Sequence, residues 1–493
     1  MIKRNTIVTI RGDEFLLNGA VTYTAESGFP KAAPWIRGKL LMLKSANCIF
    51  DDARYPDFGS DSSPYFGDVS WDYPDGRWDP DRNTREFVGA LPAYRKHGLL
   101  MMNANLMGNQ PAGRAASHPW VNSAFTPRGD LKPAYLSRLR RVMDAADELG
   151  MVMLVGLFYP RMDANVMVQN SIKKDDALIR KCIVNAVQFL VESGHRNIMV
   201  EIGNESNHPL YNHWMPRGER VFEAIQIARE ACAGIFPVST SVFEIDHLTD
   251  KALDSMDFVL LHTPVGDPKR NGEQMKAAVR RAGKSKPVMN KEDTSIFCMA
   301  AALESGGGFA LYFQGLNDYR EGLQCIPIDW RINTVGKWNY FSQVARLSGS
   351  PAPERPLDNP EAPTTVLKGF SDGDVLTEGN IGAFHVEPVL PHHFPSTMPM
   401  FLQRVEYLID GIPVKYGGKG LRYPETPFEP RDFALNGEDL IHGPLGFDLR
   451  KLPRGEHTLL AIPYYLEESE PEPHGWGCCD TTGTIAEVRF LFR

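Results

Sequence analysis

The sequence lacks the segments that would send the chain into or across a membrane. Charged and polar residues interrupt the N-terminal stretch MIKRNTIVTIRGDEFLLNG every few positions, so it holds no apolar signal core and no cleavage site. No run reaches the roughly eighteen uncharged apolar residues that a membrane helix needs. We therefore expect a cytoplasmic protein with no membrane partner.

Cysteine is scarce, and basic residues form no cluster. Seven cysteines are scattered over 493 residues, and an odd, scattered set argues against a disulfide framework. The adjacent Cys478 and Cys479 lack a second Cys/His pair at ligand spacing, so we expect no metal site there. The net charge of −8, without any Lys/Arg run, disfavours a nucleic-acid partner. Nothing calls for a cofactor, and a homo-oligomer stays possible.

What the chain does contain is a long alternation of apolar runs and amphipathic helical stretches, extending to about residue 345. For example, Leu139, Val142, Met143 and Ala146 recur at helical spacing, and Gly150 follows as a stop. Eight apolar runs are interpreted as buried parallel strands, at 47–51, 99–103, 152–157, 197–203, 235–240, 258–262, 287–290 and 309–313. Eight such strands with intervening helices predict a closed (β/α)8 TIM barrel, an α/β fold.

The remaining segments differ in character from the barrel. Residues 1–24 alternate and carry an Asn-Gly turn, which predicts a hairpin capping the bottom of the barrel. The barrel is expected over 25–349, followed by a Pro-rich linker over 350–363. Residues 364–493 contain short alternating runs separated by Gly and Pro, which predict a C-terminal all-β sandwich domain.

Two glutamates follow apolar runs at the predicted fourth and seventh strands. Asn204 and Glu205 follow 197–203, and Glu292 follows 287–290. Barrel enzymes place catalytic groups at the C-terminal ends of their strands, and these two strands face each other across the mouth. Cleaving an acetal needs a proton for the departing oxygen and a negative group beneath the oxocarbenium-like carbon. The spacing thus predicts an acid/base and a nucleophile.

The motifs around these glutamates resemble those of clan A glycoside hydrolases, the superfamily of cellulases, β-mannanases and β-galactosidases. The resemblance rests on IGNES, on Glu292 in MNKEDTS and on DFVLLHTP with His262, and it spans about 45 to 345. It implies a retaining mechanism, Glu205 as acid/base and Glu292 as nucleophile. It also implies that Asn204 contacts the sugar 2-hydroxyl and that His262 lies at the mouth.

Other polar and aromatic residues near predicted strand ends are candidate substrate contacts. Members of the clan often carry Arg at the end of strand 2 and Trp at the end of strand 8, where this chain has Asn103 and Gln314. Trp214 follows strand 4 closely and is the best candidate for stacking on a sugar face. The further candidates are Asp51, which ends the first run, and Tyr159, which follows the third.

Three alternatives to a retaining glycosidase stay open. Glu205, Glu292, His262 and an Asp could bind a divalent metal ion, as in a sugar isomerase. The barrel could also bind carbohydrate without turnover. The carboxylates could be structural, with Lys291 pairing Glu292. The favoured prediction is a retaining, exo-acting glycoside hydrolase for a short β-linked oligosaccharide or small β-glycoside, with a carbohydrate substrate and neither metal nor cofactor.

Overall fold

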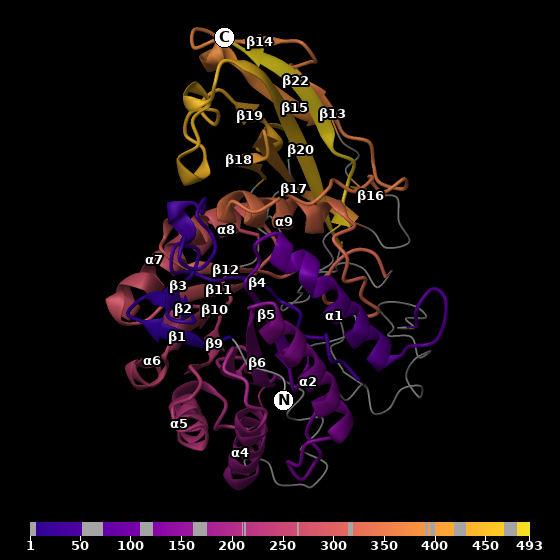
Figure 1. Ribbon diagram of the computed structural model, residues 1–493. Helices are drawn as coiled ribbons and strands as arrows, with labels where there is room; N and C mark the ends of the chain where they lie inside the picture. Colours follow the sequence, from indigo (N-terminus) through magenta and orange to yellow (C-terminus); the bar gives the residue numbers. More distant parts are fainter. Residues whose placement is uncertain are drawn as a thin grey trace.

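The protein consists of a parallel barrel surrounded by helices and a β-rich C-terminal part on one side of it (Figure 1). The computed structural model describes residues 6–51, 72–108, 122–160, 175–209, 211, 213–263, 266–313, 319–389, 393–394, 400–418, 430–467 and 481–493. This arrangement confirms the predicted α/β fold class, a TIM barrel with a C-terminal domain that is β-rich.

The barrel sheet closes through a strand that is interrupted at one residue. Its strands pair in the order β8-β7-β6-β5-β4-β12-β11-β10-β9, all in parallel. Only Thr240 separates β8 from β9, so these two segments act as one strand and the barrel has eight. The strands are β4 (Leu41–Leu43), β5 (Met101–Asn105), β6 (Val152–Phe158), β7 (Ile198–Gly203), β8 (Val238–Ser239), β9 (Ser241–Val242), β10 (Val259–Leu261), β11 (Val288–Asp293) and β12 (Gly308–Leu311).

Helices follow the strands and cover the barrel (Figure 1). Several begin with a side-chain cap: Asp79, Asp175, Asp267 and Ser295 each accept a hydrogen bond from a backbone N–H of the first turn. The helices are α1 (Pro80–Lys96), α2 (Pro133–Glu148), α4 (Asp176–Glu192), α5 (Val221–Ala231), α6 (Asp250–Ser255), α7 (Pro268–Ala282), α8 (Ile296–Glu304) and α9 (Val335–Ser348).

The first strand lies earlier than the sequence predicts. The strand expected at 47–51 is wrong, because β4 occupies Leu41–Leu43 and the chain then turns, with Cys48 N–H donating to Ser45 O. The apolar run at 48–50 is buried for another reason: Phe50 packs edge-on against Trp78. A short strand followed by a buried turn gives the same hydrophobic pattern as one longer strand.

The N-terminal segment closes the bottom of the barrel as a three-stranded antiparallel sheet rather than a two-stranded hairpin. Its strands are β1 (Val8–Arg11), β2 (Glu14–Leu17) and β3 (Ala20–Val21). Asn18 and Gly19 both have positive φ, as the expected Asn-Gly turn requires. Phe15 packs against Phe258, directly before β10, and Val8 N–H donates to Arg196 O, two residues before β7.

The C-terminal part contains two sheets around a shared apolar core. The core includes Val386 and Leu435 from one sheet and Tyr407 and Phe490 from the other. The first sheet has the order β13-β15-β19, and the second runs β14-β22-β20-β17-β16, with β18 and β21 at its sides. The strands are β13 (Val366–Lys368), β14 (Val375–Leu376), β15 (His385–Val389), β16 (His393–Phe394), β17 (Met400–Ile409), β18 (Ile412–Gly417), β19 (Leu435–Asn436), β20 (Gly455–Glu467), β21 (Thr481–Thr482) and β22 (Ala486–Phe492).

The larger C-terminal sheet is buried on both faces. On one side, Tyr407 and Leu459 join the core of the C-terminal part. On the other, Leu408, Leu460 and Ile462 belong to the core of the barrel, and β17 and β20 lie over α9 (Figure 1). The two parts of the chain are therefore joined by continuous apolar packing.

No helix in the described ranges combines the length and apolar character needed to cross a bilayer.

Replacing Phe15 tests the contribution of the N-terminal sheet to stability. Phe15 is fully buried, so Phe15→Ala should lower the free energy of unfolding by about 3–5 kcal/mol. Val366→Ala, on an exposed position of β13, should change it by less than about 0.5 kcal/mol. Denaturant titration measures both, and equal values for the two variants would show that the sheet does not hold the barrel bottom.

Candidate active site

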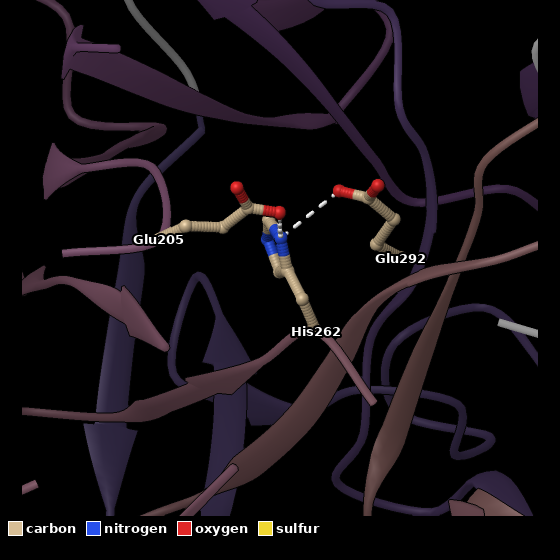
Figure 2. A group of neighbouring side chains, drawn as sticks. All are labelled: Glu205, His262 and Glu292. Carbon is tan, nitrogen blue, oxygen red and sulfur yellow. Dashed lines mark hydrogen bonds and ion pairs between the residues drawn. The ribbon is translucent and has the colours of Figure 1, made fainter. Parts of the chain in front are cut away.

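Three side chains from different strand ends meet at the mouth of the barrel (Figure 2). Nδ1 of His262, the residue after β10, lies 2.9 Å from Oε1 of Glu205 and 2.9 Å from Oε2 of Glu292. One oxygen of each carboxylate and a His262 ring nitrogen all lie within 4.8 Å of one another. All three residues are buried. The structure therefore brings together the two glutamates and the histidine that the sequence singled out.

Glu205 is held in a backbone conformation that non-glycine residues rarely adopt. Its φ is +52°, in the left-handed region. The interrupted strand supports this turn: Ser241 Oγ accepts a hydrogen bond from Glu205 N–H at 2.9 Å, and Thr240 Oγ1 donates to Gly203 O at 2.8 Å. Strained residues persist only where surrounding contacts over-determine them, and they cluster at functional sites.

Glu292 lies within β11, at a bulge in the strand pairing. Asn290 pairs with Phe309, and Asp293 pairs with Leu311, so the register shifts between Asn290 and Asp293. Bulges beside active sites redirect side chains. The bulge lets two successive residues reach buried polar groups of the barrel: Glu292 contacts His262, and Lys291 contacts Glu201 of β7.

The cation beside Glu292 is Lys44, which directly follows β4. Its Nζ donates to Glu292 Oε2, and its side chain is almost fully buried. Burial raises the pKa of the Glu292 carboxyl, but Lys44 and then His262 lower it by more, so the pKa lies well below its ordinary value. Glu292 is therefore ionised at neutral pH, the state that a nucleophile requires. The possible pairing of Lys291 with Glu292 is wrong, because Lys291 binds Glu201 instead.

A second buried ion pair orients Asn204. Lys291 Nζ donates to Glu201 and also to Asn204 Oδ1, the latter at 3.2 Å. This bond to Oδ1 fixes the orientation of the amide, and Nδ2 is buried without a hydrogen-bond partner in the described part of the chain. Burial lowers the pKa of Lys291, while Glu201 raises it. The Lys291–Glu201 pair thus holds the Asn204 amide in an orientation in which Nδ2 can donate a hydrogen bond.

The side chain of Asp293, the neighbour of Glu292, accepts hydrogen bonds from backbone N–H groups. Its Oδ1 accepts hydrogen bonds from the N–H groups of Gly266, Thr294 and Ser295. Burial raises the pKa of Asp293 to about 6 against these hydrogen bonds. Glu292, and not Asp293, therefore faces His262.

Two of the expected substrate contacts are engaged elsewhere. Asp51 Oδ2 accepts a hydrogen bond from Arg138 of α2 at 2.7 Å, so its carboxylate is ion-paired with a helix. Asn103 Oδ1 accepts from Ser45 N–H at 2.6 Å, and its Nδ2 donates to Asn105 Oδ1 at 3.1 Å. Asn103 therefore joins the ends of β4 and β5. Both assignments followed from strand-end position, which does not reveal partners distant in sequence.

The other aromatic candidates lie in loops that leave the barrel mouth. Trp214, in the loop after β7, is 47% exposed, so much of its indole is open to a ligand. Tyr159 directly follows β6, is half-buried and packs against the barrel core. Gln314 lies outside the described residues.

Sequence reasoning missed Lys44, Glu201 and the role of Lys291. A signal for Lys44 exists, because KLLMLK places a charged residue directly after a short apolar run, as IMVEIGNE does for Glu205. Glu201 and Lys291 lie inside barrel strands where apolar side chains usually fill the interior, and charged residues at such positions indicate a paired, buried set.

No protein-family model and no curated protein matches the sequence. Among solved structures, the chain is similar to a glycoside hydrolase family 5 mannosidase from Rhizomucor miehei, with 13% identity and a TM-score of 0.42, over 70% of this chain and 98% of that one. It is similar to an endo-β-1,4-mannanase from Thermotoga petrophila, with 13% identity and a TM-score of 0.38, over 83% and 95% of the two chains.

An FMN-binding β-glucuronidase from Facaelibacterium prausnitzii is also similar, with 10% identity and a TM-score of 0.40, over 99% of this chain and 59% of that one. All these TM-scores are below 0.5. The fold and the site are therefore described from the strand pairing and from the contacts of Glu205, His262 and Glu292.

The left-handed backbone at Glu205 predicts an unusual order of stabilities. Glu205→Gly should be more stable than Glu205→Ala by about 1 kcal/mol, since glycine adopts positive φ without a Cβ penalty. At the exposed helical position Glu273 of α7, the order should reverse by a similar amount. Denaturant unfolding of the four variants measures both differences. If alanine were the more stable replacement at both positions, residue 205 would carry no such strain.

Proposed function

We propose that the protein is a retaining glycoside hydrolase that uses Glu205 as acid/base and Glu292 as nucleophile. The observation that carries the proposal is the separation of the two carboxylates, whose nearest described oxygens lie within 4.8 Å. Retaining enzymes place their carboxyl groups about 5–5.5 Å apart, whereas inverting enzymes need about 6.5–9.5 Å to admit a water molecule. The ionised state of Glu292 supports the nucleophilic role.

In the proposed first step, Glu292 attacks the anomeric carbon while Glu205 gives its proton to the glycosidic oxygen. The carbon–oxygen bond to the leaving group breaks, an alcohol departs, and a glycosyl ester on Glu292 remains. In the second step Glu205 takes a proton from water, and the resulting hydroxide attacks the same carbon. The ester bond breaks, the sugar leaves with its original configuration, and both glutamates return to their starting states.

His262 and Lys44 would stabilise the negative charge of the Glu292 carboxylate before the ester forms and after it is hydrolysed. In the free enzyme both contact Oε2 of Glu292, so the carboxylate is oriented before substrate arrives. As the ester forms, the negative charge on Glu292 disappears, and His262 keeps its contact with Glu205. Asn204 Nδ2 would donate to the sugar 2-hydroxyl, a contact that gains strength in the transition state.

For the substrate, we infer a short β-linked oligosaccharide or a small β-glycoside, attacked from its end. The exposed Trp214 would stack on a sugar ring at the mouth, where C–H faces match an aromatic surface. This inference also depends on the expected cytoplasmic location, in which polymers are not available.

A metal-dependent reaction is the second candidate, since Glu205, His262 and Glu292 have metal-ligand chemistry and lie close together. Lys44 disfavours it: the ammonium already neutralises Glu292, and it would repel a divalent cation bound to the same carboxylate. A chelator should accordingly leave activity unchanged, whereas loss of activity restored by Mn²⁺ or Mg²⁺ would favour the metal-dependent reaction.

Azide rescue tests the two assigned roles. Glu205→Ala and Glu292→Ala should each lower turnover of aryl β-glycosides by roughly 10²–10⁴-fold. Azide should restore Glu292→Ala and give an α-glycosyl azide, because the ion enters from the face that the carboxylate vacated. With Glu205→Ala it should give the β-azide. Product configuration is read by NMR.

Glu230→Ala, at an exposed position of α5, is the control and should behave as wild type. If both active-site variants turned over an accepted substrate at the wild-type rate, the assignment of the two glutamates would be wrong. If no glycoside in the panel reacted with wild type, a binding-only barrel would be favoured, and glycan binding without turnover would support it.

The ion pair with Lys44 predicts a change in pH dependence. Lys44→Met removes the cation that lowers the pKa of Glu292, so this pKa should rise, and the acidic limb of the kcat/KM profile should move up by about 1–3 pH units. Activity should therefore fall more at pH 5 than at pH 7. Lys39→Met, at the bottom end of the same strand, should leave the limb in place; an unmoved limb in Lys44→Met would contradict the role of Lys44.

A further inference from the structure

The C-terminal sheet carries a buried ion pair on the face that packs against the barrel. Arg404 and Glu406 lie two residues apart on β17, and both side chains are fully buried. Arg404 Nε donates to Glu406 Oε1 at 3.0 Å, and its guanidinium lies 3.8 Å from the ring centre of Tyr464. Burying two charges is costly unless further hydrogen bonds satisfy them, so the remaining partners of the pair are informative.

Those partners come from the barrel segment that follows Glu292. Arg404 donates to Thr294 O at 3.2 Å, and Ser295 Oγ donates to Glu406 Oε1 at 2.8 Å. Thr294 and Ser295 are the second and third residues after Glu292. Ser295 also caps α8 by accepting from Phe297 N–H at 3.1 Å. The pair thus fixes the chain between the bulge that presents Glu292 and the helix that follows it.

A second contact reaches the segment that follows His262. Tyr416 of β18 donates from its Oη to Gly266 O at 2.6 Å. On its other side, Gly266 N–H donates to Asp293 Oδ1 at 3.2 Å. The Tyr416 ring also packs edge-on against Phe297 of α8, with 6.1 Å between ring centres. The C-terminal sheet therefore touches the exits of both β10 and β11.

We propose that the C-terminal sheet is a positioning element of the active site, with Arg404, Glu406 and Tyr416 fixing the segments that follow Glu292 and His262. The inference rests on the proposed glycosidase function. Lys44 and His262 hold the Glu292 carboxylate from within the mouth, but the carboxylate stays in reach only if its backbone does too. A shift of about 1 Å in a reacting group costs on the order of 10²-fold in rate.

An element that positions the active site must itself be held in place, and the C-terminal sheet is packed on both of its faces. Leu408, Leu460 and Ile462 of its inner face belong to the barrel core, and its outer face packs on a second core. A sheet held on both faces moves little relative to the strands it contacts.

Two mild variants, each with a matched control, test the proposal. Ser295→Ala removes the hydrogen bond to Glu406, and Tyr416→Phe removes only the hydroxyl that binds Gly266. Thr249→Ala deletes a comparable cap, that of α6, and Tyr407→Phe deletes a hydroxyl bonded to Phe433 O within the C-terminal part. Neither control residue makes a hydrogen bond to the segments that follow Glu292 and His262 in the described structure.

Below the melting temperature of all four variants, Ser295→Ala should lower kcat about tenfold or more, and Tyr416→Phe severalfold. KM should stay within about twofold, and the acidic limb of the pH profile should shift, because Glu292 moves relative to Lys44. Both controls should keep the wild-type kcat and profile. If Ser295→Ala and Tyr416→Phe lost only thermal stability, as the controls do, the sheet would be a structural support and the proposal would be wrong.

Crystal structures of wild type, Ser295→Ala and Thr249→Ala give a readout that does not depend on turnover. Loss of the Glu292–His262 contact in Ser295→Ala alone would support positioning even if wild type hydrolysed no glycoside, in which case the proposed function fails and this inference stands. An unmoved Glu292 together with an unchanged kcat in an active enzyme would overturn the inference while leaving the proposed function intact.

Discussion

The structure depends on a balance of buried charge at the mouth of the barrel. Lys44 neutralises Glu292, and Lys291 neutralises Glu201. In a site of low dielectric, removing Lys291 would leave the buried Glu201 carboxylate without its ion pair, and removing Lys44 would leave Glu292 with His262 alone. The two pairs also join distant strands, since the first bridges β4 to β11 and the second bridges β11 to β7. Charge balance and barrel geometry are therefore linked, and the catalytic roles proposed for Glu205 and Glu292 depend on both.

Irregular backbone occurs where each of the two glutamates emerges from the barrel. One strand of the barrel is interrupted at Thr240, and the side chains of Thr240 and Ser241 hold the turn of Glu205. The bulge in β11 presents Glu292. A regular barrel would place neither carboxylate where it lies, and departures from ideal geometry at functional sites are stabilised by the contacts around them.

Much of this architecture could be predicted from the sequence. The alternation of apolar runs and helices predicted the barrel, and the polar residues that follow two buried runs predicted the pairing of Glu205 with Glu292. These features are local patterns that repeat along the chain. The first strand was misplaced because a three-residue strand and a buried turn share one hydrophobic pattern.

What could not be predicted depends on contacts between residues far apart in sequence. The partner of Asp51, Arg138, lies 87 positions away from it in the sequence. Lys44 and Glu292 are separated by 248 positions, so no local motif contains both. The same holds for the C-terminal sheet, whose strands were predictable while its contacts with Thr294 and Ser295 were not.

The burial of Lys44 has a consequence for the solution conditions that the protein tolerates. Dissolved ions screen charges at a surface over a Debye length of about 8–10 Å at physiological ionic strength, but they screen buried pairs much less. The side chain of Lys44 is 1% exposed and that of Glu292 is 10% exposed. The orientation and ionisation of Glu292 are thus much less sensitive to ionic strength than the ion pairs on the protein surface.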